Sequence, residues 1–140
     1  MEKNELAVSV VDHMMKHDLF SQWLGITVVE IKEGYSKIQM LVRKEMINGL
    51  GVVHGGIAFS LADSAFAFAC NGRNNLSLAL DTSINFIKPV QPGDELTAET
   101  KEVHNGKGTG LYHVTITNQR DRVVALFKGT CFRTGKKLIE

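Results

Sequence analysis

The chain has 140 residues, of which 44% are hydrophobic, 22% are charged and only two are proline. This composition is typical of a globular protein and excludes a disordered one, and the length allows a real hydrophobic core. A formal net charge of +1 shows no charge imbalance of the kind that indicates a nucleic-acid or membrane surface. We therefore expect one domain over residues 1–140, with neither nucleic acid nor membrane as its partner.

The first half of the chain predicts a helix, a hairpin and a second helix. Residues 4–18 place apolar side chains at helical spacing, and two β-rich runs within 26–43 flank Glu33-Gly34. A loop over 44–56 then opens a nearly all-apolar run that stops near Asn71-Gly72. A helix that is apolar on all sides is normally buried, and this one is too short to cross a bilayer.

The second half changes to a period of two. Leu78, Leu80, Thr82, Ile84 and Phe86 share one parity, which predicts a half-buried strand over 78–86. Further strands are expected at 95–103, 109–118 and 123–132, with turns short enough to make the sheet antiparallel. One buried helix and this many strands predict an α+β fold in which the sheet wraps the helix.

The N-terminal sequence and the spacing of the cysteines and histidines predict the compartment and the absence of a metal site. The N-terminus has neither the basic start nor the unbroken apolar core of a signal peptide. Cys70 and Cys131 lie far apart without C-x-x-C spacing, so a reduced, cytoplasmic setting is the expectation. The five histidines match no zinc-ligand pattern, and we expect no metal site.

The apolar helix contains a single carboxylate, Asp63, which must find partners or lose its charge because burying an unpaired ion is costly. Around it runs the string H-G-G-x-x-F-S-L-A-D-S-A-F-A-F-A-C-N, residues 54–71. Asn48-Gly49 precedes this string, and INFIKPVQPGDELTAET follows it. From about Leu24 to Arg133 the chain resembles the hotdog-fold acyl-CoA thioesterases, most closely those of the phenylacetic-acid-degradation type.

The resemblance implies hydrolysis of an acyl-CoA thioester to a free acid and CoA, without a cofactor other than the CoA of the substrate. It implies that Asp63 acts as base or nucleophile, that the Gly55 N–H binds the thioester carbonyl, and that Asn48 helps to place the reactants. It also implies a homodimer with one continuous sheet, paired again into a homotetramer. The acyl group is expected to be aryl-acetyl, with short or medium aliphatic chains as the alternative.

The residues support this chemistry independently. Desolvation raises the pKa of a carboxylate in an apolar helix, and free N–H groups at a helix start suit an oxyanion. Gly55 and Gly56 leave room for a carbonyl to approach the backbone. Gly55 and Asp63 are eight positions apart, about 12 Å along a helix, whereas reacting atoms must lie about 3–3.5 Å apart. We therefore expect two antiparallel copies of the helix to share each active site.

Supporting roles are expected for residues of lower specificity. His54 is predicted to brace the loop at the substrate site. Some relatives carry a water-orienting serine where this chain has Ala79, with Ser83 four residues further on, and Ser64, next to the carboxylate, is the candidate for that part. Lys88, together with Lys107 and Gly108 of the 105–110 loop, is predicted to contact CoA. Further cationic candidates for the CoA phosphates are Arg120, Arg122, Arg133, Lys136 and Lys137.

Several alternatives stay open. Asp63 could be a structural carboxylate that holds a loop N–H, and Asn48 and the two glycines could serve only the turn. A 3-hydroxyacyl-thioester dehydratase would need an Asp with a nearby His, for which His54 is the candidate. A non-catalytic acyl-CoA sensor would be expected to carry a DNA-binding domain, for which the roughly 20 residues before the first strand leave no room.

Overall fold

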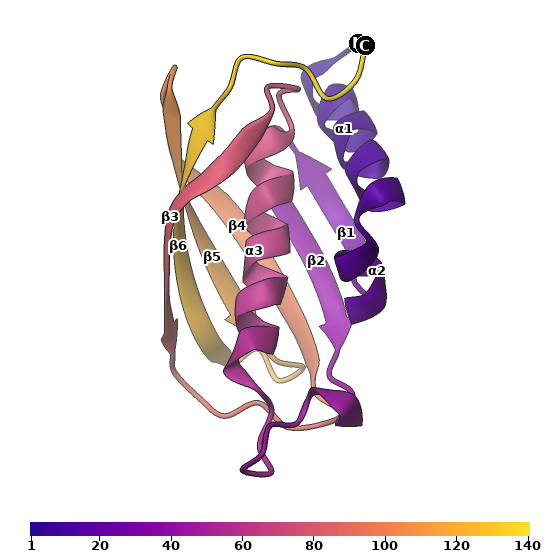
Figure 1. The fold of residues 1–140 in the computed structure, drawn as a ribbon, viewed down its shortest axis with the longest axis vertical. Coiled ribbons are helices and arrows are strands. Elements are labelled where there is room, and N and C mark those ends of the chain that lie inside the picture. Colours follow the sequence, from indigo (N-terminus) through magenta and orange to yellow (C-terminus); the bar gives the residue numbers. More distant parts are fainter.

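The computed structural model describes residues 1–140 as one antiparallel sheet curved around a central helix. The elements are α1 (Lys3–His17), α2 (Leu19–Leu24), β1 (Thr27–Lys32), β2 (Tyr35–Leu41), the 3-10 turn η1 (Lys44–Met46), α3 (Gly55–Asn71), β3 (Ser77–Phe86), β4 (Glu95–Asn105), β5 (Thr109–Thr117) and β6 (Val123–Arg133). In Figure 1, α3 lies across one face of the sheet, α1 and α2 stand beside it, and the two chain termini meet at one end. The expected α+β arrangement is confirmed.

The strand order β1-β2-β4-β5-β6-β3 makes β1 and β3 the two edges of the sheet. Every pairing is antiparallel, and the predicted hairpin over 26–43 is the β1–β2 pair. The strand after the central helix therefore crosses to the far edge instead of pairing with its sequence neighbours. The three last strands fall within two residues of the predicted bounds.

The core is one cluster of 26 buried residues, to which α3 contributes the largest share of any helix. Phe66 and Phe68 are fully buried, and the Phe66 ring makes a T-shaped contact with Tyr112 and a tilted contact with Phe127. Gly129 of β6 makes this possible, because a Cβ there would meet the Phe66 ring at 2.8 Å. The apolar sequence of α3 is thus explained by a helix enclosed by its own sheet.

Strand β3 differs from the expectation. The predicted strand is present, and the alternation holds in its second half, where Thr82 and Ile84 are half-buried. Leu78, Leu80 and Phe86 are instead 57%, 63% and 59% exposed in the single chain, so their predicted burial is wrong. A bulge between Ala79 and Asp81 switches the parity, which places Leu78 on the outer face of the sheet and Thr82 on the face toward α3. The edge position leaves this strand without a second neighbour, and its apolar residues lie open.

The N-terminal helix also differs, because it ends at His17 and a second, short helix follows. Asp18 separates α1 from α2: its backbone N–H bonds to the carbonyl of Met14, and its side chain accepts from the N–H of Ser21. Aspartate is a favoured N-cap residue, and here it starts a new helix in another direction. None of the helices is long and apolar enough to cross a membrane.

Candidate active site

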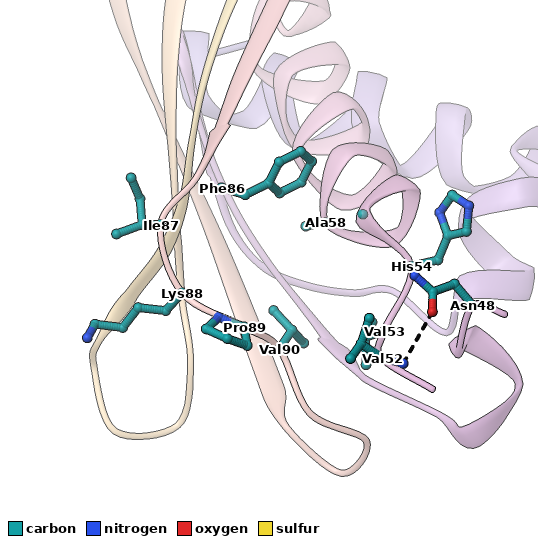
Figure 2. Close-up of a pocket in the computed structure, with 11 residues that line it drawn as sticks. Asn48, Val52, Val53, His54, Ala58, Phe86, Ile87, Lys88, Pro89 and Val90 are labelled. Atoms are coloured by element: carbon teal, nitrogen blue, oxygen red, sulfur yellow. Dashed lines mark hydrogen bonds between the residues drawn. The ribbon is translucent and has the colours of Figure 1, made fainter. Parts of the chain in front are cut away.

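A pocket of about 450 Å³ opens at the N-terminal end of α3, between the helix start and the segment that follows β3. The residues around it are mostly apolar, with three polar side chains at the rim; they are Asn48, Val52, Val53, His54, Gly55, Ala58, Phe86, Ile87, Lys88, Pro89 and Val90. Figure 2 shows the two segments facing each other across this space. The structure therefore brings together four of the predicted site residues, Asn48, His54, Gly55 and Lys88.

Gly55 is the first residue of α3, and its backbone N–H has no acceptor within the chain. The residue is exposed, so the N–H is open to a ligand in the pocket. The ring of Phe86 covers its Cα: a Cβ on Gly55 would lie 3.2 Å from the ring Cζ. Any larger residue here would displace the aromatic ring slightly, and glycine also leaves room for a carbonyl to approach the backbone.

His54 and Asn48 hold the loop that leads into the helix. His54 is the N-cap, and its Nδ1 accepts the N–H of Gly56 at 2.8 Å, so the predicted bracing role is confirmed. The Oδ1 of Asn48 accepts the N–H of Leu50 and of Val52, which closes the turn drawn in Figure 2. The amide nitrogen of Asn48 donates no hydrogen bond within the chain and remains available at the pocket.

Asp63 lies two turns further along α3, outside the pocket lining. Its side chain is half-buried and makes no hydrogen bond or ion pair within the chain, so it does not hold a loop N–H. Burial raises the pKa of this carboxyl, and the negative charge of Asp18 raises it further. An unpaired carboxylate with a raised pKa has the properties of a general base.

The hydroxyl groups expected to orient a water lie elsewhere. Ser64 is buried, and its Oγ lies 2.8 Å from Oγ of Ser21 on α2. Ser83 lies on the outer face of the sheet in a shallow hollow with His113 and Lys128, because the β3 bulge sets its parity. Ala79 carries no hydroxyl. The contact that Ser64 makes in the single chain is therefore a link between two helices.

The basic residues predicted for CoA do not gather at one place. Lys88 lies beside the pocket and is exposed, but its side chain points away from Asn48 and His54 in Figure 2. Lys107 and Gly108 are exposed in the β4–β5 turn, which lies at the other end of α3; the Gly108 carbonyl accepts the N–H of Arg133 there. The structure therefore joins Lys88 to the pocket and separates the 105–110 loop from it.

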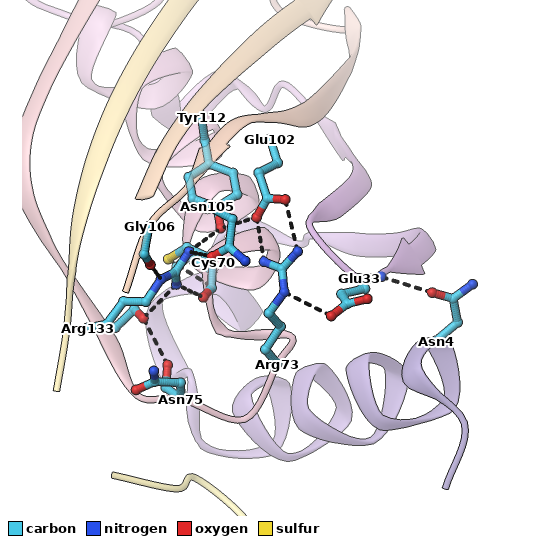
Figure 3. A network of polar contacts seen from close by, with 12 residues as sticks. Asn4, Glu33, Cys70, Arg73, Asn75, Glu102, Asn105, Gly106, Tyr112 and Arg133 are labelled. Carbon is cyan, nitrogen blue, oxygen red and sulfur yellow. Dashed lines mark hydrogen bonds and ion pairs between the residues drawn. The ribbon is translucent and has the colours of Figure 1, made fainter. Parts of the chain in front are cut away.

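Arg133 is not a free cation, and its prediction as a phosphate ligand is wrong. It is 7% exposed, and its guanidinium donates to Cys70 O, Ser77 Oγ, Gly106 O, Asn105 Oδ1 and Tyr112 Oη. Figure 3 shows how this cluster continues through Glu102 to Arg73. These hydrogen bonds join the C-terminal end of α3 to strands β3, β4 and β5.

Sequence reasoning missed two features of this region. The segment from Phe86 to Val90 forms a whole wall of the pocket, and the sequence signal for it is the aromatic Phe86, which is followed three residues later by Pro89. The sequence predicts Asp18 within a single N-terminal helix, whereas its influence on Asp63 depends on tertiary proximity. Over all 140 residues, no group of three or more His, Cys, Asp or Glu side chains is placed to hold a metal ion.

Comparison with known proteins gives the class of this fold and site. A model of the thioesterase superfamily matches residues 50–125. The acyl-coenzyme A thioesterase PaaI of Escherichia coli is 42% identical over 122 residues, 87% of each chain, and a putative esterase of Archaeoglobus fulgidus is 42% identical over 96% of this chain and 88% of its own. The structure of E. coli PaaI, from the phenylacetic acid degradation operon, superposes with a TM-score of 0.94, 38% identity and coverage of 97% and 99%. A Streptococcus mutans protein solved with acetyl-CoA bound superposes with a TM-score of 0.77, 31% identity and coverage of 80% and 90%.

A curved antiparallel sheet around one helix, with an open site at the helix start, defines a hotdog-fold enzyme. The chain belongs to the thioesterase superfamily, and within it to the PaaI type. The predicted fold, family and enzyme class are thereby confirmed, and the chain is a thioesterase.

Proposed function

We propose that this chain hydrolyses an acyl-CoA thioester to a free acid and CoA. The observation that carries the proposal is a pair of unsatisfied groups on one helix: the free N–H of Gly55 in an apolar pocket, and the unpaired carboxylate of Asp63 with its raised pKa. An oxyanion needs such a donor, and water needs such a base. The acyl-CoA thioesterase name of the E. coli relative and the acetyl-CoA bound to the S. mutans neighbour support the substrate class.

In this mechanism the thioester carbonyl oxygen accepts the Gly55 N–H, and the free amide of Asn48 orients the thioester. As a general base, the Asp63 carboxylate takes a proton from the water that attacks the carbonyl, and it returns this proton to the CoA sulfur as the tetrahedral species collapses to the free acid. As a nucleophile, the carboxylate attacks the carbonyl itself and CoA leaves as its thiolate. Water then hydrolyses the resulting mixed anhydride to the free acid and restores Asp63. Lys88 is proposed to contact the CoA phosphates, with Lys107 and Gly108 as a second contact. No cofactor takes part. The acyl group is proposed to be aryl-acetyl or a short to medium chain.

We further propose that each site is shared by two subunits. The helix α3 is continuous from Gly55 to Asn71, so Gly55 and Asp63 of one chain stay about 12 Å apart along its axis. Edge strand β3 is ten residues long and exposes Leu78 and Leu80, and such an edge favours pairing with another strand. Pairing of two β3 edges in a homodimer, and of two dimers in a homotetramer, would bring Gly55 and Asn48 of one subunit toward Asp63 of the other.

The dehydratase alternative has less support. It needs a histidine that exchanges a proton near the carboxylate, whereas Nδ1 of His54 accepts the Gly56 N–H and only Nε2 is left for such an exchange. A non-catalytic sensor would have no use for an unpaired carboxylate with a raised pKa on the helix that also carries a free N–H.

Mixing two inactive variants tests the reaction and the shared site together. Asp63→Asn removes the base, and Asn48→Asp removes the amide donor while an oxygen still accepts the N–H groups of the loop. Co-expression of the two variants restores one intact site in each mixed dimer, so about a quarter of the wild-type CoA release returns. Sites contained in one chain would restore nothing. No release of CoA by the wild-type protein across a broad panel of acyl-CoA esters would overturn the function itself.

A further inference from the structure

The α1–α2 junction carries a second carboxylate close to the proposed base. Asp18 is held at the start of α2, where its Oδ1 accepts the backbone N–H of Ser21 at 2.9 Å and its Oδ2 accepts the Ser21 hydroxyl at 2.6 Å. Because both oxygens are engaged by one residue, the carboxylate has a fixed position. Asp18 is therefore a charge whose location is set by the fold, unlike the exposed carboxylates of α1.

A chain of hydroxyl groups connects this carboxylate to the helix of the active site. Oγ of Ser21 lies 2.8 Å from Oγ of Ser64, the residue next to Asp63. Ser21 has one hydroxyl proton, which it donates to Asp18, so Ser64 must be the donor in the Ser21–Ser64 contact. Both serines are buried, at 0% and 8% exposure. The chain runs in one direction and ends on the Asp18 carboxylate.

We propose that Asp18 is a positioning residue for the thioesterase reaction, acting on Asp63 through its fixed negative charge and through the Ser21–Ser64 link between α2 and α3. A second negative charge nearby opposes ionisation of a carboxyl group, which makes the carboxylate a stronger base. This inference rests on the function proposed above, in which Asp63 is the base.

Among the charged groups around Asp63, Asp18 is the one that shifts its pKa. The pKa of Asp63 is raised first by burial and then by Asp18. On the sheet side of α3, the ionisable groups Tyr112, Cys131 and Arg133 cluster toward the C-terminal end of the helix, where Arg133 bonds to Cys70 O.

Further ionisable groups lie on the helices themselves. On α1, the ring of His17 bonds to the carbonyl of His13 in its own helix. Within α3, the negative charge of Asp63 contributes to raising the pKa of the Cys70 thiol. The proposed pairing of subunits would add His54 and Lys88 from a second chain.

Asp18→Asn is the matched test, because asparagine removes the charge and still caps the helix through its one oxygen. Its amide nitrogen takes the place of the oxygen that accepts the Ser21 hydroxyl, so that hydrogen bond changes direction. Asp12→Asn, an exposed position on α1, is the control. The primary readout is the pKa of Asp63 itself, followed by carboxyl-carbon NMR in the intact protein and assigned with Asp63→Asn. We expect Asp18→Asn to lower this pKa and Asp12→Asn to leave it unchanged. Added salt should lower the wild-type value toward that of Asp18→Asn, because salt screens the charge.

The second readout is the pH dependence of kcat/KM, in which the acidic limb should move to lower pH in Asp18→Asn alone. If the asparagine variant does not fold, Asp18→Ser keeps a capping oxygen without the charge. An Asp63 titration that is the same in wild type and in Asp18→Asn would overturn the proposal and leave Asp18 as a helix cap. The titration needs no substrate, so a protein that releases no CoA would overturn the proposed function while the NMR result still decides the role of Asp18.

Discussion

The two ends of helix α3 are built in opposite ways. At its N-terminal end, the Gly55 N–H and the Asn48 amide have no partners in the chain, and the pocket around them is mostly apolar. At its C-terminal end, the Arg133 guanidinium makes five hydrogen bonds and joins a cluster that extends to Arg73. Groups left unsatisfied are available to a ligand, whereas groups that are fully paired fix the structure.

This contrast predicts that substitutions at one end of α3 reduce turnover, whereas substitutions at the other end reduce stability. Substitutions at the open end and at Asp63 should reduce turnover and leave the free energy of unfolding nearly unchanged, because nothing in the fold depends on those groups. Substitutions in the paired cluster should reduce the free energy of unfolding and leave turnover of the folded protein nearly unchanged.

The largest effect is expected from Asp63→Asn. Loss of a general base should lower kcat by roughly 10²–10⁴. The melting temperature should stay the same or rise, because the carboxylate makes no bond in the fold and a neutral amide is cheaper to bury. Steady-state kinetics and thermal unfolding of the same variant measure both quantities, with Asp12→Asn as the control. Retained turnover with a clearly lower melting temperature would return Asp63 to a structural role.

Arg133→Met should lower the stability of the protein and leave its kcat nearly unchanged. Removal of the guanidinium leaves its buried acceptors without a donor, at a cost of about 1–3 kcal/mol of unfolding free energy for each one that stays unsatisfied. The kcat below the new melting temperature should stay within about twofold of wild type. Chemical denaturation and CoA release at low temperature give the two numbers. Lys16→Met, exposed on α1 and outside the proposed CoA contacts, is the matched control for loss of a cation. A large fall in kcat of folded Arg133→Met would mean that the two ends of the helix are coupled.

Sequence patterns predicted the parts of this molecule that depend on local chemistry. The period of the apolar residues and the turn residues were enough for the sheet strands and for α3, and the motif from His54 to Asn71 was enough for the family. The bracing role of His54 could be predicted because an N-cap contact spans only two residues.

The predictions that failed concern features that depend on contacts between residues far apart in the sequence. The bulge in β3 changes the face of every residue before it, and no alternation of apolar residues reveals a bulge. The sequence predicts Arg133 to be a surface cation because its five acceptors are far from it along the chain: they lie in α3, β3, β4, the β4–β5 turn and β5. The influence of Asp18 on Asp63 spans 45 positions of sequence and arises only when α2 packs on α3.

Gly55→Ala probes the open end without removing a polar group. The added methyl would lie 3.2 Å from the Phe86 ring, so the ring must shift within the pocket where the thioester is proposed to bind. We expect kcat/KM to fall by roughly tenfold, which corresponds to about 1.4 kcal/mol. Gly49→Ala is the control, because a Cβ there meets nothing within 4 Å. In Gly55→Ala, the further change Phe86→Leu should recover part of the loss; no recovery would show that the ring contact is not the cause.

The smallest effect concerns the paired end and depends on pH. The Arg73 guanidinium and the Tyr112 hydroxyl hold the pKa of Glu102 below its usual value. A lowered pKa in the folded state gives stability that is present above the unfolded pKa and is lost as the pH falls through the folded one. Because the Arg73 and Glu102 side chains are 26% and 20% exposed, Glu102→Gln should cost only about 1 kcal/mol at pH 7. The difference from wild type should shrink as the pH falls below the ordinary glutamate pKa of about 4.3. Denaturation curves at pH 7, 5, 4 and 3 measure it, with the exposed Glu95→Gln as the control. A difference that stays constant over this range would mean that Glu102 contributes through shape and not through its charge.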